Sequence, residues 1–178
     1  MSNKLYKAAE EGNFEVVQYL VENEVNIHVA NEYALRKAAS NGHLKVVKYL
    51  VESGAEISAS EYDAIKWAAN NGHLNIVKYL VKEGAIINSS NDFALRASAK
   101  NGHFEVVKYL VENGADISAD DDGALKNSAS NGHLKVVKYL VKMGADIHAA
   151  NRYALRSSAK NGHHEVVKYL TKYMENNE

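Results

Sequence analysis

The stretch SNGHLKVVKYLV, residues 40–51, returns unchanged at residues 130–141, and this repetition decides the fold. Its Asn-Gly-His motif occurs five times, at intervals of 30 residues. The central glycine belongs to a series that runs through the chain: Gly12, Gly42, Gly72, Gly102, Gly132 and Gly162. A fixed period of roughly 20–50 residues is typical of repeat architectures. The sequence therefore predicts a repeat protein of six units.

The first half of each unit is expected to be a helix with a narrow apolar stripe. In residues 31–60 the stripe consists of Ala34, Leu35, Ala38 and Ala39, which recur at the helical period. Asn31 is the predicted N-cap, and Glu32 follows in the first turn, where the helix dipole favours a negative charge. Gly42 ends the helix, because glycine adopts the left-handed conformation without a Cβ penalty.

The second half of the unit predicts another helix and a short return loop. The apolar face of this helix consists of Leu44, Val46, Val47, Leu50 and Val51, and Gly54 closes it. One such helix pair cannot bury its apolar stripe alone, whereas stacked pairs bury a continuous core. We therefore predict an all-α solenoid of six stacked helix-turn-helix units.

The units leave no linker between them, which predicts a single domain over residues 1–178. The expected boundaries are residues 1–30, 31–60, 61–90, 91–120, 121–150 and 151–178. Polar residues replace apolar ones at stripe positions of the first and last units, namely at Lys4, His164 and Thr171. Polar residues suit outer faces that meet water, so we expect a complete array with an N-terminal and a C-terminal cap.

The repeated string resembles the ankyrin repeat. In the second unit it reads Gly42-His43-Leu44, Val46-Val47 and Leu50, followed by Gly54-Ala55-Glu56 and Ala59. Two features depart from the family pattern: Tyr33-Ala34-Leu35-Arg36 replaces its Thr-Pro-Leu-His tetrad, and the unit is shorter than the usual length of about 33 residues. The missing residues belong to the β-hairpin finger. Short-fingered units of this kind resemble the ankyrin arrays of giant viruses and amoebae, or a consensus-built ankyrin scaffold.

The resemblance implies a non-catalytic module that binds partner proteins with its fingers and its concave helix face. Because the fingers are short here, we expect the first-helix face to make more of the contacts. A structural or designed repeat scaffold with no natural target is the alternative.

The side of the first helix opposite the alanine stripe is where the units differ. Several of its residues are aromatic, and exposed aromatic residues are typical interface anchors. Trp67, the only tryptophan, is the predicted hot spot. Neutral drift on a solvated face would give the same variation, so that alternative stays open. The predicted partner-binding residues are Tyr33, Arg36, Lys37, Asp63, Lys66, Trp67, Asn70, Phe93, Arg96, Lys100, Lys126, Asn127, Tyr153, Arg156 and Lys160.

Cations occupy one equivalent first-helix position, which we call the cation position: Arg36, Lys66, Arg96, Lys126 and Arg156. Since packed helices lie about 8–10 Å apart, these side chains could form a positive stripe for an acidic peptide. Alternatively, each cation pairs with an acid near the start of its own helix, as Arg36 could with Glu32 four residues earlier. The sequence favours this local pairing.

Histidines recur at one position as well: His43, His73, His103, His133 and His163. Adjacent copies are expected to lie one helix-pair spacing apart, too far to share a metal ion. We therefore expect each ring to bond the backbone of a turn. No catalytic residue, metal site or cofactor is predicted, and we do not expect an enzyme.

Composition narrows the function further. The 178 residues include no cysteine, which excludes disulfides and cysteine-based zinc sites. A net charge of −1 argues against nucleic acid as a partner, and the short apolar runs argue against a membrane. No secretory signal is visible, which favours a cytoplasmic location. We expect a monomer that binds a protein or peptide. If the cations at the cation position contact this partner, the partner should be acidic.

Overall fold

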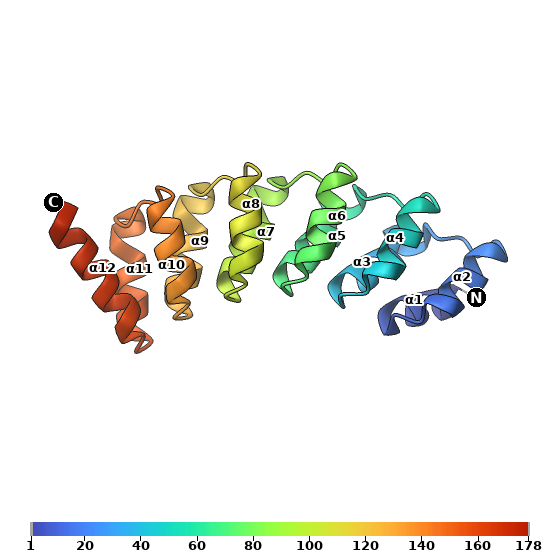
Figure 1. Ribbon diagram of the computed structural model, residues 1–178, viewed down its shortest axis with the longest axis horizontal. Helices are drawn as coiled ribbons and strands as arrows, with labels where there is room; N and C mark the ends of the chain where they lie inside the picture. Colours follow the sequence, from blue (N-terminus) through green and yellow to red (C-terminus); the bar gives the residue numbers. More distant parts are fainter. Residues whose placement is uncertain (1, 178) are drawn as a thin grey trace. The chain divides into compact units, whose positions relative to one another are not determined.

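The computed structural model describes residues 2–177, apart from the side chains of Ser2 and Asn31. These described residues form twelve α-helices and no strand, which confirms the all-α prediction (Figure 1). The helices are α1 Ser2–Glu11, α2 Phe14–Glu22, α3 Val29–Ser40, α4 Leu44–Glu52, α5 Ala59–Asn70, α6 Leu74–Lys82, α7 Ser89–Lys100, α8 Phe104–Glu112, α9 Ala119–Ser130, α10 Leu134–Lys142, α11 Ala149–Lys160 and α12 His164–Asn177.

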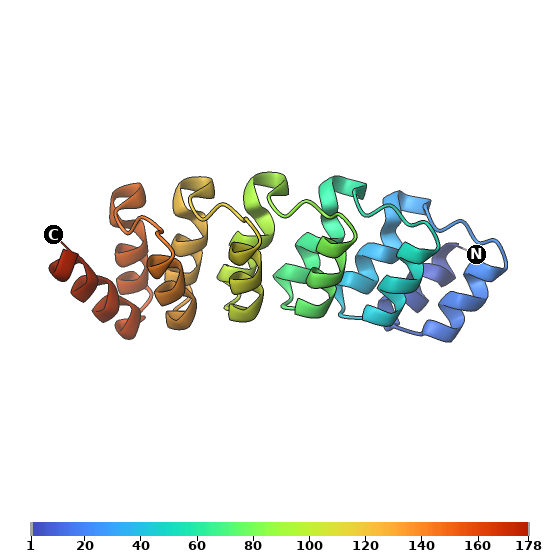
Figure 2. The same cartoon turned by 45° about the horizontal axis from the view of Figure 1, so that its top comes forward.

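The chain forms two compact halves, which meet in sequence between residues 89 and 90. From here on we call these halves the first and the second unit, and we call the 30-residue elements repeats. In the first unit, α3 packs against both α1 and α5, and α4 packs against both α2 and α6 (Figures 1 and 2). In the second unit, α9 packs against α11, and α10 packs against α8 and α12. Each unit is therefore a two-layer stack, with first helices in one layer and second helices in the other. A single domain over the whole chain stays a prediction.

The predicted apolar stripes form the core between these layers. Ala64 is 2% exposed, and Leu95 and Ala129 are 0% exposed. The second helices bury Leu50, Leu80, Leu110 and Leu140 completely. Burying a side chain of this size stabilises the fold by about 1.5–3 kcal/mol. At the outer positions that the sequence assigned to polar residues, Lys4, His164 and Thr171 are exposed.

The Asn-Gly-His motif joins neighbouring repeats. Nε2 of His163 lies 2.9 Å from the carbonyl oxygen of Ser130, and Nδ2 of Asn161 donates to the same oxygen at 2.7 Å. The same paired contact joins His73 and Asn71 to Ser40. The sequence predicted a bond to turn backbone but missed that the acceptor belongs to the preceding repeat. Two donors thus satisfy a carbonyl at the end of the preceding first helix, where no intrahelical partner is available.

The histidine ring also explains the glycine that precedes it by 31 residues. Gly132 has a φ of +75°, and a Cβ added there would lie 2.5 Å from Nδ1 of His163. Gly162, in the last repeat, has a φ of +77° and nothing within 4 Å of an added Cβ. Backbone conformation and close packing both require glycine at position 132, whereas only conformation requires it at position 162.

The start of the first helices differs from the prediction. Three consecutive residues have left-handed backbone angles in each of four repeats: residues 60–62, 90–92, 120–122 and 150–152. We call this segment the left-handed turn. α3 also begins earlier than predicted, at Val29, and the side chain of the expected N-cap Asn31 lies outside the described side chains. The left-handed conformation costs roughly 1–2 kcal/mol for each L-residue other than glycine, so contacts from elsewhere must hold the turn.

Candidate binding face

The cation position supplies some of these contacts. In the second unit, Nε of Arg96 donates to the carbonyl of Asn91 at 2.8 Å, and one of its terminal nitrogens donates to the carbonyl of Ser90 at 3.4 Å. In the first unit, Arg36 donates to the carbonyl of Ala30 at 3.0 Å, and Lys66 to that of Ser60 at 3.4 Å. Arg96 and Lys66 thus bind carbonyl oxygens of the left-handed turn in their own helix, and Arg36 binds that of Ala30, whose φ of +53° is also left-handed. A structural role therefore accounts for part of their repetition.

The same cations are paired with carboxylates. Asp63 accepts from Arg36 at 3.1 Å and lies 3.0 Å from the Lys66 ammonium. Arg96 pairs with Asp120 at 3.0 Å, and Lys126 with Asp121 at 3.6 Å. Four of the five residues at the cation position thus pair with a carboxylate within the chain, and two of them share Asp63.

The arginine partners are not the ones that local spacing predicted. Arg36 reaches Asp63 in the following repeat, because Glu32 is buried and its carboxylate binds His28. Arg96 likewise reaches Asp120 at the start of the next first helix, α9, because Asp92 is buried. The prediction of pairing with Glu32 and Asp92 was wrong, whereas Lys66 does pair with Asp63 of its own helix.

Buried aspartates brace the left-handed turns of the second unit. Oδ1 of Asp92 accepts the backbone N–H of Asp116 at 2.9 Å, and Oδ1 of Asp122 accepts that of Asp146 at the same distance. Desolvation raises the pKa of both carboxyls above the usual aspartate value. This contact was not predicted from the sequence. Its only signal was the recurrence of aspartate after 30 residues.

An open pocket of about 340 Å³ lies on the first-helix face of the first unit. It is lined by Tyr33, Arg36, Lys37, Ser40 and Trp67, so the structure brings four of the predicted binding residues together. Trp67 is 42% exposed and comes from α5, whereas the other four come from α3.

The Tyr33 wall of this pocket is held from several sides. The Tyr6 ring meets it edge-on, with 5.1 Å between centroids. Arg36 and Lys37 lie 5.4 and 5.3 Å from its centroid. The Lys37 ammonium also donates to the Glu10 carboxylate at 2.8 Å. The hydrogen bond to Glu10 raises the pKa of Lys37 most, and the hydrogen bond to the Tyr33 hydroxyl raises it further. These contacts fix the Tyr33 side of the pocket.

The remaining predicted residues are spread over α5, α7, α9 and α11. Tyr153 is 43% exposed, and Phe93 is half-buried. Nδ2 of Asn70 donates to Asn71, and the half-buried Asn127 donates to the carbonyl of Arg96 at 3.5 Å. Lys100, Arg156 and Lys160 are exposed.

Within residues 2–177, no group of three or more His, Asp or Glu residues is arranged to hold a metal ion. None of the helices in that range has the length and apolar character of a membrane span. The absence of catalysis, cofactor and metal stays a prediction.

Comparison with known families agrees with the repeat. A model described as ankyrin repeats (3 copies) matches residues 2–61 and 58–121, and one described as ankyrin repeats (many copies) matches residues 124–171. The chain belongs to the ankyrin repeat family. Ankyrin repeats are general protein-interaction modules, and the packed helix pairs of each unit are the family's solenoid architecture.

A solved structure supports the ankyrin fold. The crystal structure of the human ASB11 ankyrin repeat domain is 24% identical to this ankyrin chain, with a TM-score of 0.86. The alignment covers 95% of this chain and 82% of that one. A search of the curated proteins finds no match.

Proposed function

We propose that this ankyrin protein binds a protein or peptide on its first-helix face, with the Tyr33–Trp67 pocket as the principal anchor. One observation supports this proposal above the others. A tryptophan and a tyrosine line an open pocket of about 340 Å³ on the face where the repeats differ in sequence. Tryptophan, tyrosine and arginine are the residue types enriched among binding hot spots.

The pocket suits an apolar or aromatic side chain of the partner. Burying such a side chain contributes about 1.5–3 kcal/mol. Tyr6, Arg36 and Lys37 already hold the Tyr33 ring, so little side-chain order must be gained on binding. Arg36 and Lys37 at the rim can add hydrogen bonds to partner carbonyl or carboxylate oxygens.

The experiment compares the proteins that the wild type and two variants capture from a cell lysate. Wild type, Trp67→Ala and Tyr19→Ala are immobilised, and proteins captured from native lysate are quantified by mass spectrometry. Tyr19 is 64% exposed on α2, in the second-helix layer, so it serves as the matched control. We expect the captured set to fall at least tenfold with Trp67→Ala and to stay within twofold with Tyr19→Ala. Equal retention by all three forms would overturn the proposed face.

The scaffold alternative makes a different prediction in the same experiment. A repeat array with no natural target would retain nothing specific in any of the three forms. The binding proposal takes the active form to be a non-catalytic, cytoplasmic monomer. Light scattering of the purified protein checks its mass against 19.6 kDa.

A further inference from the structure

We infer that Arg156, Lys160 and Tyr153 on α11 form a docking site for an acidic segment of a protein partner. The inference rests on the proposed function and assigns partner chemistry to the first helix α11.

The first step is an internal precedent for the ligand. Arg36 and Arg96 occupy the same repeat position as Arg156, and each binds a carboxylate from the next first helix along the chain. The residues that supply these carboxylates, Asp63 and Asp120, lie 27 and 24 positions further along the chain. An arginine at this repeat position therefore binds a carboxylate wherever its ion pair is seen.

The second step concerns the surroundings of Arg156. Arg156 and Lys160 are exposed, and among the described residues neither side chain has an ion pair or hydrogen bond. They are four residues apart and share one helix face, so their like charges repel. α11 contains no aspartate or glutamate, and Arg152 adds a third cation. An external carboxylate would relieve this repulsion.

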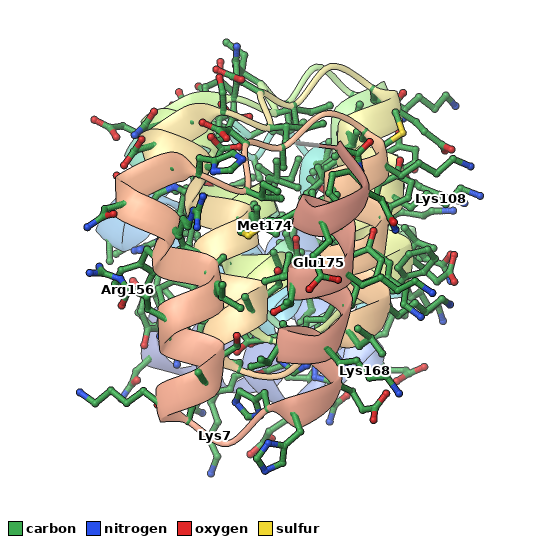
Figure 3. The ribbon with its side chains drawn as sticks, turned by 90° about the vertical axis from the view of Figure 1, so that its left-hand side faces the viewer. Lys7, Lys108, Arg156, Lys168, Met174 and Glu175 are labelled. Atoms are coloured by element: carbon green, nitrogen blue, oxygen red, sulfur yellow. The ribbon has the colours of Figure 1, made fainter. Side chains whose placement is uncertain are left out.

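The third step is the direction of the side chains. Figure 3 shows Arg156 on the outer side of α11, away from α12, whereas Lys168 on α12 points to the opposite face. Tyr153 precedes Arg156 by one helical turn and is 43% exposed. An aromatic side chain beside two free cations suits a segment that combines acidic with apolar residues.

Carboxylates are favoured over phosphates as the ligand. The anionic side chains that pair with Arg36, Lys66, Arg96 and Lys126 at this repeat position are carboxylates. A nucleic-acid site needs many phosphate contacts, whereas this cluster has three cations on a chain of net charge −1. Nucleic acid is therefore an outcome for the test to exclude.

The test uses the full chain and a defined probe. A fluorescein-labelled peptide of eight glutamates around a central phenylalanine is titrated by anisotropy at low salt, beside a peptide with glutamine in place of glutamate. The variants are Arg156→Glu and Lys168→Glu, which change charge equally within the second unit. We expect Arg156→Glu and the glutamine peptide each to weaken binding at least tenfold, and Lys168→Glu to change it less than twofold. Circular dichroism checks that both variants fold.

Two outcomes would overturn the inference. Equal weakening by Arg156→Glu and Lys168→Glu would mean unspecific attraction, and tighter binding of a single-stranded DNA of equal charge would point to nucleic acid. The lysate experiment separates the two proposals. If Trp67→Ala removes the captured proteins and Arg156→Glu does not, the proposed function stands and this inference fails. If only Arg156→Glu removes them, the Tyr33–Trp67 anchor fails instead.

Discussion

Replacing Gly132 by alanine should destabilise the fold more than the same replacement at Gly162. Both glycines end a first helix with a left-handed φ, +75° and +77°. They differ in what a methyl group would meet. At position 132 the new Cβ would lie 2.5, 2.8 and 2.9 Å from three atoms of the His163 ring, whereas at position 162 nothing lies within 4 Å.

The contacts of Gly132 give the expected difference in unfolding free energy between the two variants. Alanine in the left-handed conformation costs roughly 1–2 kcal/mol at either position. At position 132 the His163 ring must also move and lose its bond to the Ser130 carbonyl, now 2.9 Å long. A hydrogen bond contributes about 0.5–1.5 kcal/mol, and some packing is lost with it. We expect Gly132→Ala to exceed Gly162→Ala by about 1–2 kcal/mol.

Urea unfolding followed by far-UV circular dichroism measures both variants. For a chain of this size, the expected difference corresponds to roughly 2–8 °C in Tm. The double variant Gly132→Ala with His163→Ala is the control, because removing the ring removes the clash. In the His163→Ala background, Gly132→Ala should have only the conformational cost. Equal destabilisation by Gly132→Ala and Gly162→Ala would refute the reasoning.

Three further predictions follow from the core, the cation position and the buried acids. Leu110→Ala removes a fully buried side chain and should cost about 2–5 kcal/mol in urea unfolding; a cost below 1 kcal/mol would contradict the assigned core. Arg96→Ala loses the Asp120 pair and two carbonyl bonds and should cost about 1–3 kcal/mol, whereas Lys100→Ala at an exposed site should stay within about 0.5 kcal/mol. Desolvation raises the pKa of Asp122 in the folded state, so the folded protein binds a proton more readily there and loses stability as pH rises through that pKa. Asp122→Asn keeps an acceptor for the Asp146 N–H, so its stability relative to wild type should improve between pH 4 and pH 7; urea midpoints that shift the other way would contradict this assignment.

The periodicity of the sequence predicted the core, because the buried face of a helix depends on the spacing of apolar residues within that helix. A buried stripe needs small apolar residues at helical intervals, and Ala34, Leu35 and Ala64 supply them regardless of their neighbours' identity. The exposure of Trp67 and Tyr153 followed from the same helical wheel. That part of the candidate face was therefore readable from the sequence.

Contacts between repeats were not readable in this way. The left-handed turns have unrelated sequences, Ser60-Glu61-Tyr62 in one repeat and Asp120-Asp121-Asp122 in another, and none contains glycine. The arginine partners lie 24 or 27 residues away, a separation that only the stacking geometry makes close. Rules for neighbours within one helix favour a partner four residues away and therefore selected the wrong acid for Arg36 and Arg96.

The most direct test of the binding face is lysine crosslinking in native lysate followed by mass spectrometry. Lysines on the first helices can be compared with lysines on the second helices of the same chain. Lys37, Lys100 and Lys160 lie on first helices, whereas the exposed lysines Lys48, Lys108 and Lys168 lie on second helices. Our account predicts that crosslinks to partner proteins concentrate on Lys37, Lys100 and Lys160. Crosslinks concentrated on Lys48, Lys108 and Lys168 would contradict it.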